Sequence, residues 1–253
     1  MKGPLHTMRA LLKNVFLNSR VRLELISRHS SLTNALNSNG FFVERGVLSD
    51  KECKDLRGEI DNLISNGDFD WCDDLKSDFR IYAAETKISY VWLEKKLHLA
   101  NSIASSFHGA QLIFTDLIAK ISYKPGNLGS GGGWHRDSIF PQFKTILYLT
   151  DACEKNGAFE IVPMSHRTLS ALRLSFGSGH SFRSRRFTDN FIIEKFNDVS
   201  TLSGSAGDQL FVNTNAIHRG RPLEAGSRYA LTRYYFDNLS SRDRFLKELQ
   251  RLK

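Results

Sequence analysis

The chain has 253 residues, of which 41% are hydrophobic and 25% are charged, and these values are typical of one globular domain in water. No apolar run approaches the length needed to cross a bilayer, which excludes a membrane-spanning protein. The net charge of +8 is concentrated in residues 1–40 and 167–186, and such patches attract anionic partners.

Residues 1–40 are predicted to form a basic helical extension. Apolar residues recur at helical spacing from Met8 to Ile26, and a polar connector follows over residues 27–40. Because this segment contains arginine and serine but almost no acidic residue, it also has the composition of an organelle transit peptide.

The first part of the following domain combines one strand with two helices. Phe41-Phe42-Val43 predicts a short strand, and Ser49 with Glu52 forms a capping box that opens a helix reaching Asn66. A second helix is predicted from Glu94 to Phe107. The segment 68–90 between them has no clear periodicity.

From residue 111 the chain changes to short β-prone runs broken by turn residues, which is typical of an antiparallel sandwich or barrel. The predicted strands cover residues 111–123, 144–150, 158–162, 191–196, 209–214 and 228–236. The arginine-rich segment 165–188 lacks periodicity, and we expect a long insertion that covers the mouth of a site. A helical tail is predicted over residues 241–253.

A glycine cluster precedes His135-Arg136-Asp137, and the spacing of two places His135 and Asp137 on one face of a strand. Far downstream, another strand-like segment ends in His218. Two imidazoles and one carboxylate occupy one face of an octahedral ion and leave the other face open, which indicates iron(II). The alternative interpretation is a set of ordinary polar residues at strand ends.

Residues 39–236 resemble the phytanoyl-CoA dioxygenase family of iron(II)- and 2-oxoglutarate-dependent oxygenases. The motifs that carry the resemblance keep their order along the chain: Asn39-Gly40-Phe41-Phe42-Val43, Leu48-Ser49-Asp50-Lys51-Glu52-Cys53, His135-Arg136-Asp137, Asn156-Gly157-Ala158-Phe159-Glu160-Ile161-Val162-Pro163-Met164-Ser165-His166, Gly207-Asp208, His218 and Arg228-Tyr229-Ala230-Leu231. The resemblance implies a mainly β fold with flanking helices, a double-stranded β-helix (jelly roll, cupin-like). It would occupy residues 41–240, with its core at about 110–236.

The resemblance also implies the site residues. The metal ligands are His135, Asp137 and His218, and Arg228 binds the far carboxylate of 2-oxoglutarate. Strand alternation supports this choice, because Arg228 and Thr232 share one face while Arg233 lies on the other. Thr232 and Tyr148 are expected to assist Arg228, Arg233 is predicted to be a surface charge, and His166 a turn or packing residue.

The expected reaction is hydroxylation of an aliphatic C–H bond in a small, anionic metabolite such as an acyl-thioester, a phosphorylated compound or a sugar, with dioxygen as co-substrate. Candidate substrate contacts are Lys124, Trp134 and Phe140. In related halogenases a small residue replaces the carboxylate ligand, so the presence of Asp137 favours hydroxylation. Two alternatives remain open: a non-catalytic jelly-roll binding module, and a different jelly-roll metalloenzyme, a hydrolase or isomerase.

The cysteines indicate the cellular compartment. The chain has three cysteines, Cys53, Cys72 and Cys153. Because their number is odd and their spacing shows no pairs, we expect neither a disulfide framework nor a structural zinc site. A reducing compartment is therefore favoured, and we expect a cytoplasmic protein with no nucleic-acid partner.

Overall fold

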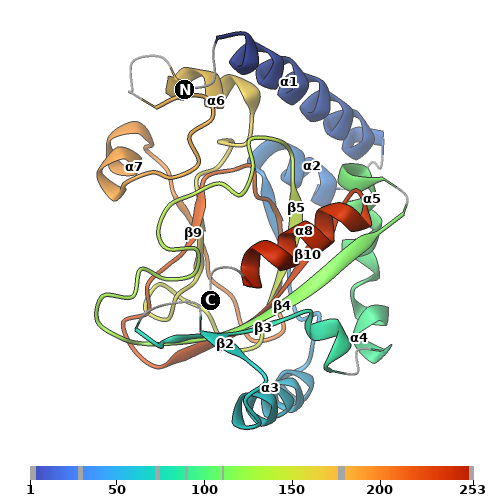
Figure 1. Ribbon diagram of the computed structural model, residues 1–253, viewed down its shortest axis with the longest axis vertical. Helices are drawn as coiled ribbons and strands as arrows, with labels where there is room; N and C mark the ends of the chain where they lie inside the picture. The colour runs from blue at the N-terminus through green and yellow to red at the C-terminus, as the bar shows by residue number, and fades with distance from the viewer. Residues whose placement is uncertain are drawn as a thin grey trace.

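Two antiparallel sheets face each other and form the centre of the molecule (Figure 1). The structure is a computed structural model that describes residues 4–27, 31–71, 75–88, 91–109, 111–175 and 180–250. Cys72 lies outside these ranges, whereas Cys53 and Cys153 are free thiols. The mainly β jelly-roll fold with flanking helices is confirmed.

The larger sheet has seven strands, and every pairing between its described strands is antiparallel. Its spatial order is β1 (Phe41–Glu44), β8 (Gln209–Asn213), β5 (Phe143–Tyr148), β10 (Ser227–Phe236), β4 (Ile113–Ser122), β3 (Asp78–Tyr82) and β2 (Asp70–Trp71). The smaller sheet contains β7 (Ser200–Leu202), β6 (Phe159–Ile161) and β9 (His218–Gly220), again in spatial order.

Helices cover the outer face of the large sheet and share one apolar cluster with it. They are α1 (Pro4–Ser27), α2 (Ser31–Asn39), α3 (Asp50–Ser65), α4 (Val91–Lys96) and α5 (His98–His108). The predicted capping box is present, with Ser49 and Glu52 bonding reciprocally at the start of α3. Because Val21, Leu25 and Leu36 belong to this cluster, the N-terminal helices pack on the domain.

The inner face of the large sheet packs against the small sheet. Their shared apolar cluster includes Ile146 and Leu210 from the large sheet and Phe159 and Ile161 from β6. Sheets that pack face to face bury alternate side chains of each strand between them. The two sheets therefore enclose the space in which the inward side chains of β4, β5 and β10 meet those of β9.

Several predicted elements differ from the structure. The predicted strand 191–196 is wrong, because these residues belong to helix α7 (Asp189–Lys195), which Thr188 caps by accepting from the Phe191 amide. A short apolar run does not distinguish a strand from a buried helical turn. The predicted helix 94–107 is two helices that meet at Leu97, and segment 68–90 supplies β2, β3 and a 3₁₀ turn, Ala84–Thr86.

The arginine-rich insertion 165–188 begins with α6 (Thr168–Ser175), which lies near α1. Its last residues form backbone hydrogen bonds with residues 134–136, from Arg136 to Arg185 and from Phe187 to Trp134. The predicted C-terminal helix is α8 (Leu239–Gln250), whose Phe245 packs against Tyr234 at 4.8 Å between ring centroids. Within the described ranges, no helix combines the length and apolarity needed to cross a bilayer.

Candidate metal centre

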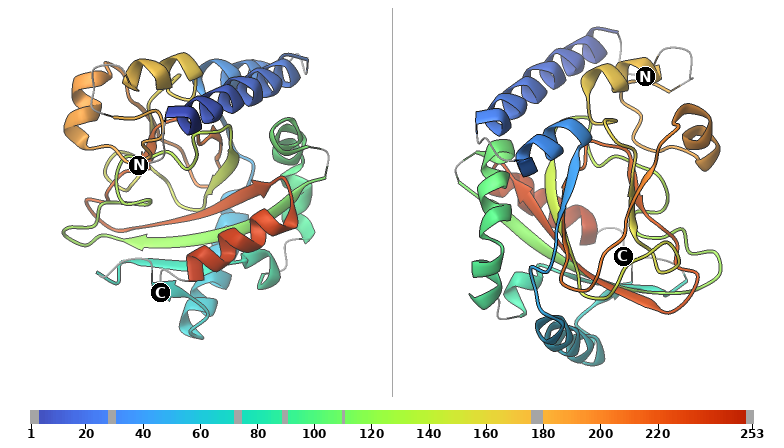
Figure 2. Two further views of the ribbon diagram at one scale, coloured as in Figure 1. Left: turned by 45° about the horizontal axis from the view of Figure 1, so that its top comes forward. Right: turned by 180° about the vertical axis from the view of Figure 1, so that it is seen from behind.

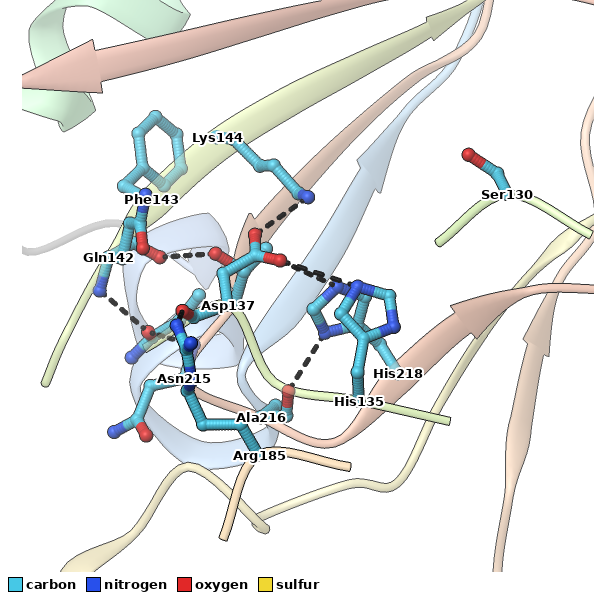
Figure 3. Close-up of polar contacts among 12 residues, drawn as sticks. Ser130, His135, Asp137, Gln142, Phe143, Lys144, Arg185, Asn215, Ala216 and His218 are labelled. Atoms are coloured by element: carbon cyan, nitrogen blue, oxygen red, sulfur yellow. Dashed lines mark hydrogen bonds and ion pairs between the residues drawn. The ribbon is translucent and has the colours of Figure 1, made fainter. Parts of the chain in front are cut away.

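Three potential ligands converge between the two sheets (Figure 3). The ligand atoms of His135, Asp137 and His218 all lie within 4.8 Å of one another. Asp137 Oδ1 is 3.4 Å from His135 Nε2 and 3.7 Å from His218 Nε2. Two imidazole nitrogens and one carboxylate oxygen therefore point at a common position, as the sequence pattern predicts.

Backbone hydrogen bonds fix this arrangement. His135 and His218 form an antiparallel bridge, with N–H to carbonyl distances of 2.9 and 2.8 Å. The Asp137 amide donates to the Thr214 carbonyl at 3.1 Å. The segment that carries two ligands is thus bonded along its length to the chain that leads into β9, which carries the third.

Each imidazole is held in the tautomer that metal binding requires. His135 Nδ1 contacts the Gly133 carbonyl and His218 Nδ1 contacts the Ala216 carbonyl, both at 2.9 Å. Because a carbonyl oxygen only accepts, each Nδ1 carries the hydrogen, and each Nε2 presents its lone pair to the common position.

The glycine cluster allows close approach to His135. Gly131 has a φ of +86°, and a Cβ added there would lie 2.2 Å from Cε1 of the His135 ring. Only glycine both adopts this conformation readily and leaves room for the imidazole. The cluster therefore lets the chain pass directly over the metal ligand.

Lys144, on β5, is a buried cation beside the ligands. Its Nζ lies 2.8 Å from Asp137 Oδ2, the oxygen that does not face the histidines. Burial would raise the pKa of Asp137, but the Lys144 ammonium opposes this effect, and the pKa lies well below its ordinary value. Burial would lower the pKa of Lys144, and Asp137 outweighs this and raises it. The pair is thus charged, with one carboxylate oxygen fixed and the other directed at the histidines.

His218 is neutral and has an unsatisfied nitrogen. Burial and the neighbouring His135 lower the pKa of His218 well below its ordinary value. Its Nε2 is buried and has no hydrogen-bond partner among the described residues. A buried polar atom without a partner is costly, and a metal ion at the common position would satisfy it. The donor set fits a divalent ion of the first transition series.

The same pocket contains Arg228. It is lined by the three ligands, Lys144, and the inward side chains of β10, namely Arg228, Ala230, Thr232 and Tyr234. Arg228 is buried, its Nε has no hydrogen-bond partner, and it forms no ion pair with another described residue. Burial lowers the pKa of its guanidinium. A buried guanidinium of this kind suits a bidentate carboxylate ligand.

The other residues predicted around Arg228 have different roles. Thr232 lines the pocket, as strand alternation predicts. Tyr148 also lines it, but its hydroxyl donates to the Leu202 carbonyl and accepts from the Phe159 amide, both at 2.9 Å. The hydroxyl hydrogen of Tyr148 is therefore already engaged, and the side chain forms a wall of the pocket instead of donating to a ligand.

The prediction that Arg233 is a surface charge is wrong, because its side chain is 0% exposed. It binds both oxygens of Asp116 on the neighbouring strand β4, at 2.8 and 2.7 Å, and it also pairs with Glu94 on α4. His166 is a buried packing residue and does not belong to the group of three potential ligands, as predicted.

None of the three predicted substrate contacts lines the pocket. Lys124 is exposed and donates to the Leu75 carbonyl. Trp134 is buried in a separate apolar cluster and stacks with Arg219. Phe140 faces Lys13 of α1 at 5.1 Å. Trp134 precedes His135 directly along the chain, but successive side chains of an extended segment point to opposite sides, so this position did not place Trp134 in the pocket.

Sequence reasoning missed several residues that line the pocket: Arg80, Leu117, Ser130, Lys144, Ile146, Phe159 and Tyr234. Lys144 offered a signal, since a lysine inside the apolar strand Phe143–Tyr148 needs a buried anionic partner. Arg80 lies in the segment without periodicity and offered none.

Part of the basic insertion lies against the ligand-bearing segment. Arg185 donates to the Asp137 carbonyl at 3.2 Å, and Arg186 donates to the Gly132 carbonyl at 3.2 Å and also contacts the Gly131 carbonyl. Both residues are exposed. Two cationic side chains are thus tethered beside the metal centre and remain open to solvent.

Comparison with known sequences gives one family and one relative. Residues 36–228 match the family described as phytanoyl-CoA dioxygenase (PhyH). The chain is 23% identical over 220 residues to ectoine dioxygenase from Nocardia farcinica (strain IFM 10152), covering 75% of this chain and 71% of that protein.

Solved structures share the fold at low identity. The epimerase SnoN in complex with Fe3+, alpha ketoglutarate and nogalamycin RO superposes with a TM-score of 0.62 and 18% identity, covering 81% of this chain and 82% of that chain. HygX from Streptomyces hygroscopicus, with nickel, 2-oxoglutarate and hygromycin B bound, gives a TM-score of 0.56 and 16% identity, covering 82% of this chain and 87% of that chain.

Proposed function

The chain belongs to the phytanoyl-CoA dioxygenase family, and from this premise we propose that this iron- and 2-oxoglutarate-dependent oxygenase hydroxylates an aliphatic C–H bond of a small, anionic metabolite. The observation that supports the proposal most directly is the buried Arg228, which shares one pocket with His135, Asp137 and His218. A jelly-roll hydrolase or isomerase needs the metal ligands but no unpaired guanidinium beside them.

The residues of this chain have separate tasks in the reaction. His135, Asp137 and His218 would hold iron(II) by one face, and Arg228 with Thr232 would bind the far carboxylate of 2-oxoglutarate. When bound, iron and 2-oxoglutarate supply the oxidising chemistry that uses dioxygen and releases succinate and carbon dioxide. Lys144 holds Asp137 so that one oxygen faces the metal position. The apolar walls Leu117, Ile146 and Phe159 exclude water from it.

The charge around the pocket supports an anionic substrate. Arg185 and Arg186 are exposed beside the ligand-bearing segment, so they are available to an acyl-thioester, phosphorylated or sugar-acid substrate. The relatives bind or act on small molecules by name, ectoine and nogalamycin among them. We include a cytoplasmic location in the proposal, on the grounds that Cys53 and Cys153 are free thiols.

The experiment is an anaerobic titration of the protein with iron(II) and 2-oxoglutarate, monitored by the weak visible charge-transfer band of the chelate. The band should form in the wild type, disappear in Arg228→Ala, and persist in the control Arg242→Ala, which removes a partly exposed arginine on α8 that does not line the pocket. Iron binding without the band in the wild type would favour the hydrolase or isomerase. Absence of metal binding would favour the binding module. Succinate release stimulated by anionic but not by neutral metabolites would then support the substrate class.

A further inference from the structure

Helix α1 buries only one side against the domain. Ala10, Asn14, Val21 and Leu25 are buried on that side. The opposite side carries six exposed large hydrophobic residues, with exposed fractions from 41% to 68%: Met8, Leu12, Val15, Phe16, Leu23 and Ile26. Figures 1 and 2 show α1 along the outer edge of the molecule, with one side free of other elements.

These six residues form one stripe. At about 100° per residue they fall within roughly a third of the helix circumference, centred opposite the buried side. They make up six of the thirteen exposed large hydrophobic side chains in the described chain, so the apolar exposure is concentrated on this helix. Single exposed hydrophobic residues need no explanation, but a continuous stripe of them marks an interaction surface.

The stripe is flanked by cations. Arg9 lies on one side of it and Arg22 on the other, both exposed, with Lys13 and Arg20 further around the helix. Glu24 is the only acidic residue of α1. Across a groove, α6 adds Leu169, which is 70% exposed, and the exposed Arg167 precedes that helix. The surface therefore combines apolar and positively charged groups over two neighbouring helices.

We propose that this face, formed by the apolar stripe of α1 with Leu169, attaches the protein peripherally to an anionic lipid surface. An apolar stripe edged by basic residues lies in the plane of a bilayer interface, with the apolar side chains among the acyl chains and the cations at the headgroups. A second copy of the chain is the less suitable partner, because two such faces would bring like charges together. The inference stands independently of the proposed reaction.

The test is co-sedimentation of the full chain with two kinds of vesicle, pure phosphatidylcholine and phosphatidylcholine mixed with phosphatidylglycerol. Binding is expected only to the mixed vesicles and should weaken in high salt, which screens the charges. The triple variant Leu12→Gln, Phe16→Gln, Leu23→Gln should lose about tenfold or more of the affinity, since each apolar side chain contributes to insertion.

Leu239→Gln is the matched control, because Leu239 is 53% exposed but lies on α8 and is not part of the stripe, so the affinity of this variant for the mixed vesicles should not change. The triple variant replaces exposed residues only, and an unchanged unfolding curve will show that it is folded. Failure of the wild type to bind mixed vesicles, or equal binding by the triple variant, overturns the proposal. A concentration-dependent dimer that the triple variant dissociates overturns it in favour of a second copy.

Discussion

Lys144 is the residue next to the metal position whose role is easiest to isolate. It contacts Asp137 Oδ2 at 2.8 Å and thereby leaves Oδ1 to face the two histidines. We expect Lys144→Met to weaken iron(II) binding by about 10- to 100-fold, the usual cost of losing a group that orients a ligand. Lys144→Arg should restore part of the affinity. Competition with a chromophoric chelator measures the change.

A matched variant separates this effect from the general loss of a lysine. Lys120, on strand β4, pairs with Asp61 at 2.8 Å and does not line the pocket that contains the metal position. Lys120→Met should leave the iron affinity unchanged. Tighter iron binding in Lys144→Met would show instead that charge repulsion between the ammonium and the ion outweighs the orientation of Asp137.

His166 should make stability depend on pH. Burial lowers the pKa of His166 from 6.5 in the unfolded chain to about 4 in the folded protein. Between these values the unfolded chain binds a proton that the folded protein does not, so the free energy of unfolding rises with pH through this window. The contribution is fully present above pH 6.5 and is lost as the pH falls toward 4, by at most about 3 kcal/mol.

Urea unfolding at several pH values, in the presence of a chelator, measures this dependence. His166→Gln should flatten the slope between pH 6.5 and 4, whereas the exposed His98→Gln should not. An identical slope in the wild type and His166→Gln would assign the acid sensitivity to other groups.

The two faces of strand β10 have different roles, one in the pocket and one in a buried ion cluster. Arg228 and Thr232 point into the pocket, whereas Arg233 points outward into an ion cluster with Asp116 and Glu94. Removing one partner of a buried pair leaves an uncompensated charge. We expect Arg233→Met to lower the free energy of unfolding by about 3–5 kcal/mol, as measured by urea denaturation.

Arg242→Met is the comparison, since it removes one partner of the surface pair Arg242–Asp243 on α8. Surface pairs contribute at most about 1 kcal/mol, so this variant should be nearly neutral. Equal stability losses in the two variants would contradict the role assigned to burial.

The sequence predicted correctly those elements that a pattern of neighbouring residues defines. The alternation in residues 228–236 gave the correct faces of β10, and the capping box located the start of α3. The short apolar run in α7 was ambiguous by length. Arg233 was misjudged because its partner Asp116 lies opposite it on β4, and only strand pairing brings the two together.

Sequence motifs indicated some of the residues that line the candidate site but not others. The three ligands and Arg228 are carried by motifs that are recognisable along the chain. Lys144 and Arg80 reach the pocket from strands whose inward residues no motif marks. Tyr148 lines the same pocket as Arg228, but the engagement of its hydroxyl by Leu202 and Phe159 depends on packing between the sheets.

Metal and 2-oxoglutarate should stabilise the molecule as a whole, because they bind a site that only the folded chain contains. At 100 times its dissociation constant a ligand adds about 2.7 kcal/mol. We expect nickel(II) with 2-oxoglutarate to raise the melting temperature by about 5 °C or more, and the increase to vanish in His135→Ala. Differential scanning calorimetry measures both. An equal increase in that variant would locate the binding elsewhere.

The backbone bridge between His135 and His218 has a consequence for the order in which the chain acquires its parts. The two histidines stand on either side of the insertion and of four strands, β5, β6, β7 and β8, and they meet only when both sheets have closed. Contacts between distant parts of a chain form late in folding, after the entropy of closing the loop has been overcome. A chain that ends after β8 therefore carries two of the three candidate ligands, and the full set comes together only when β9 has paired with β6.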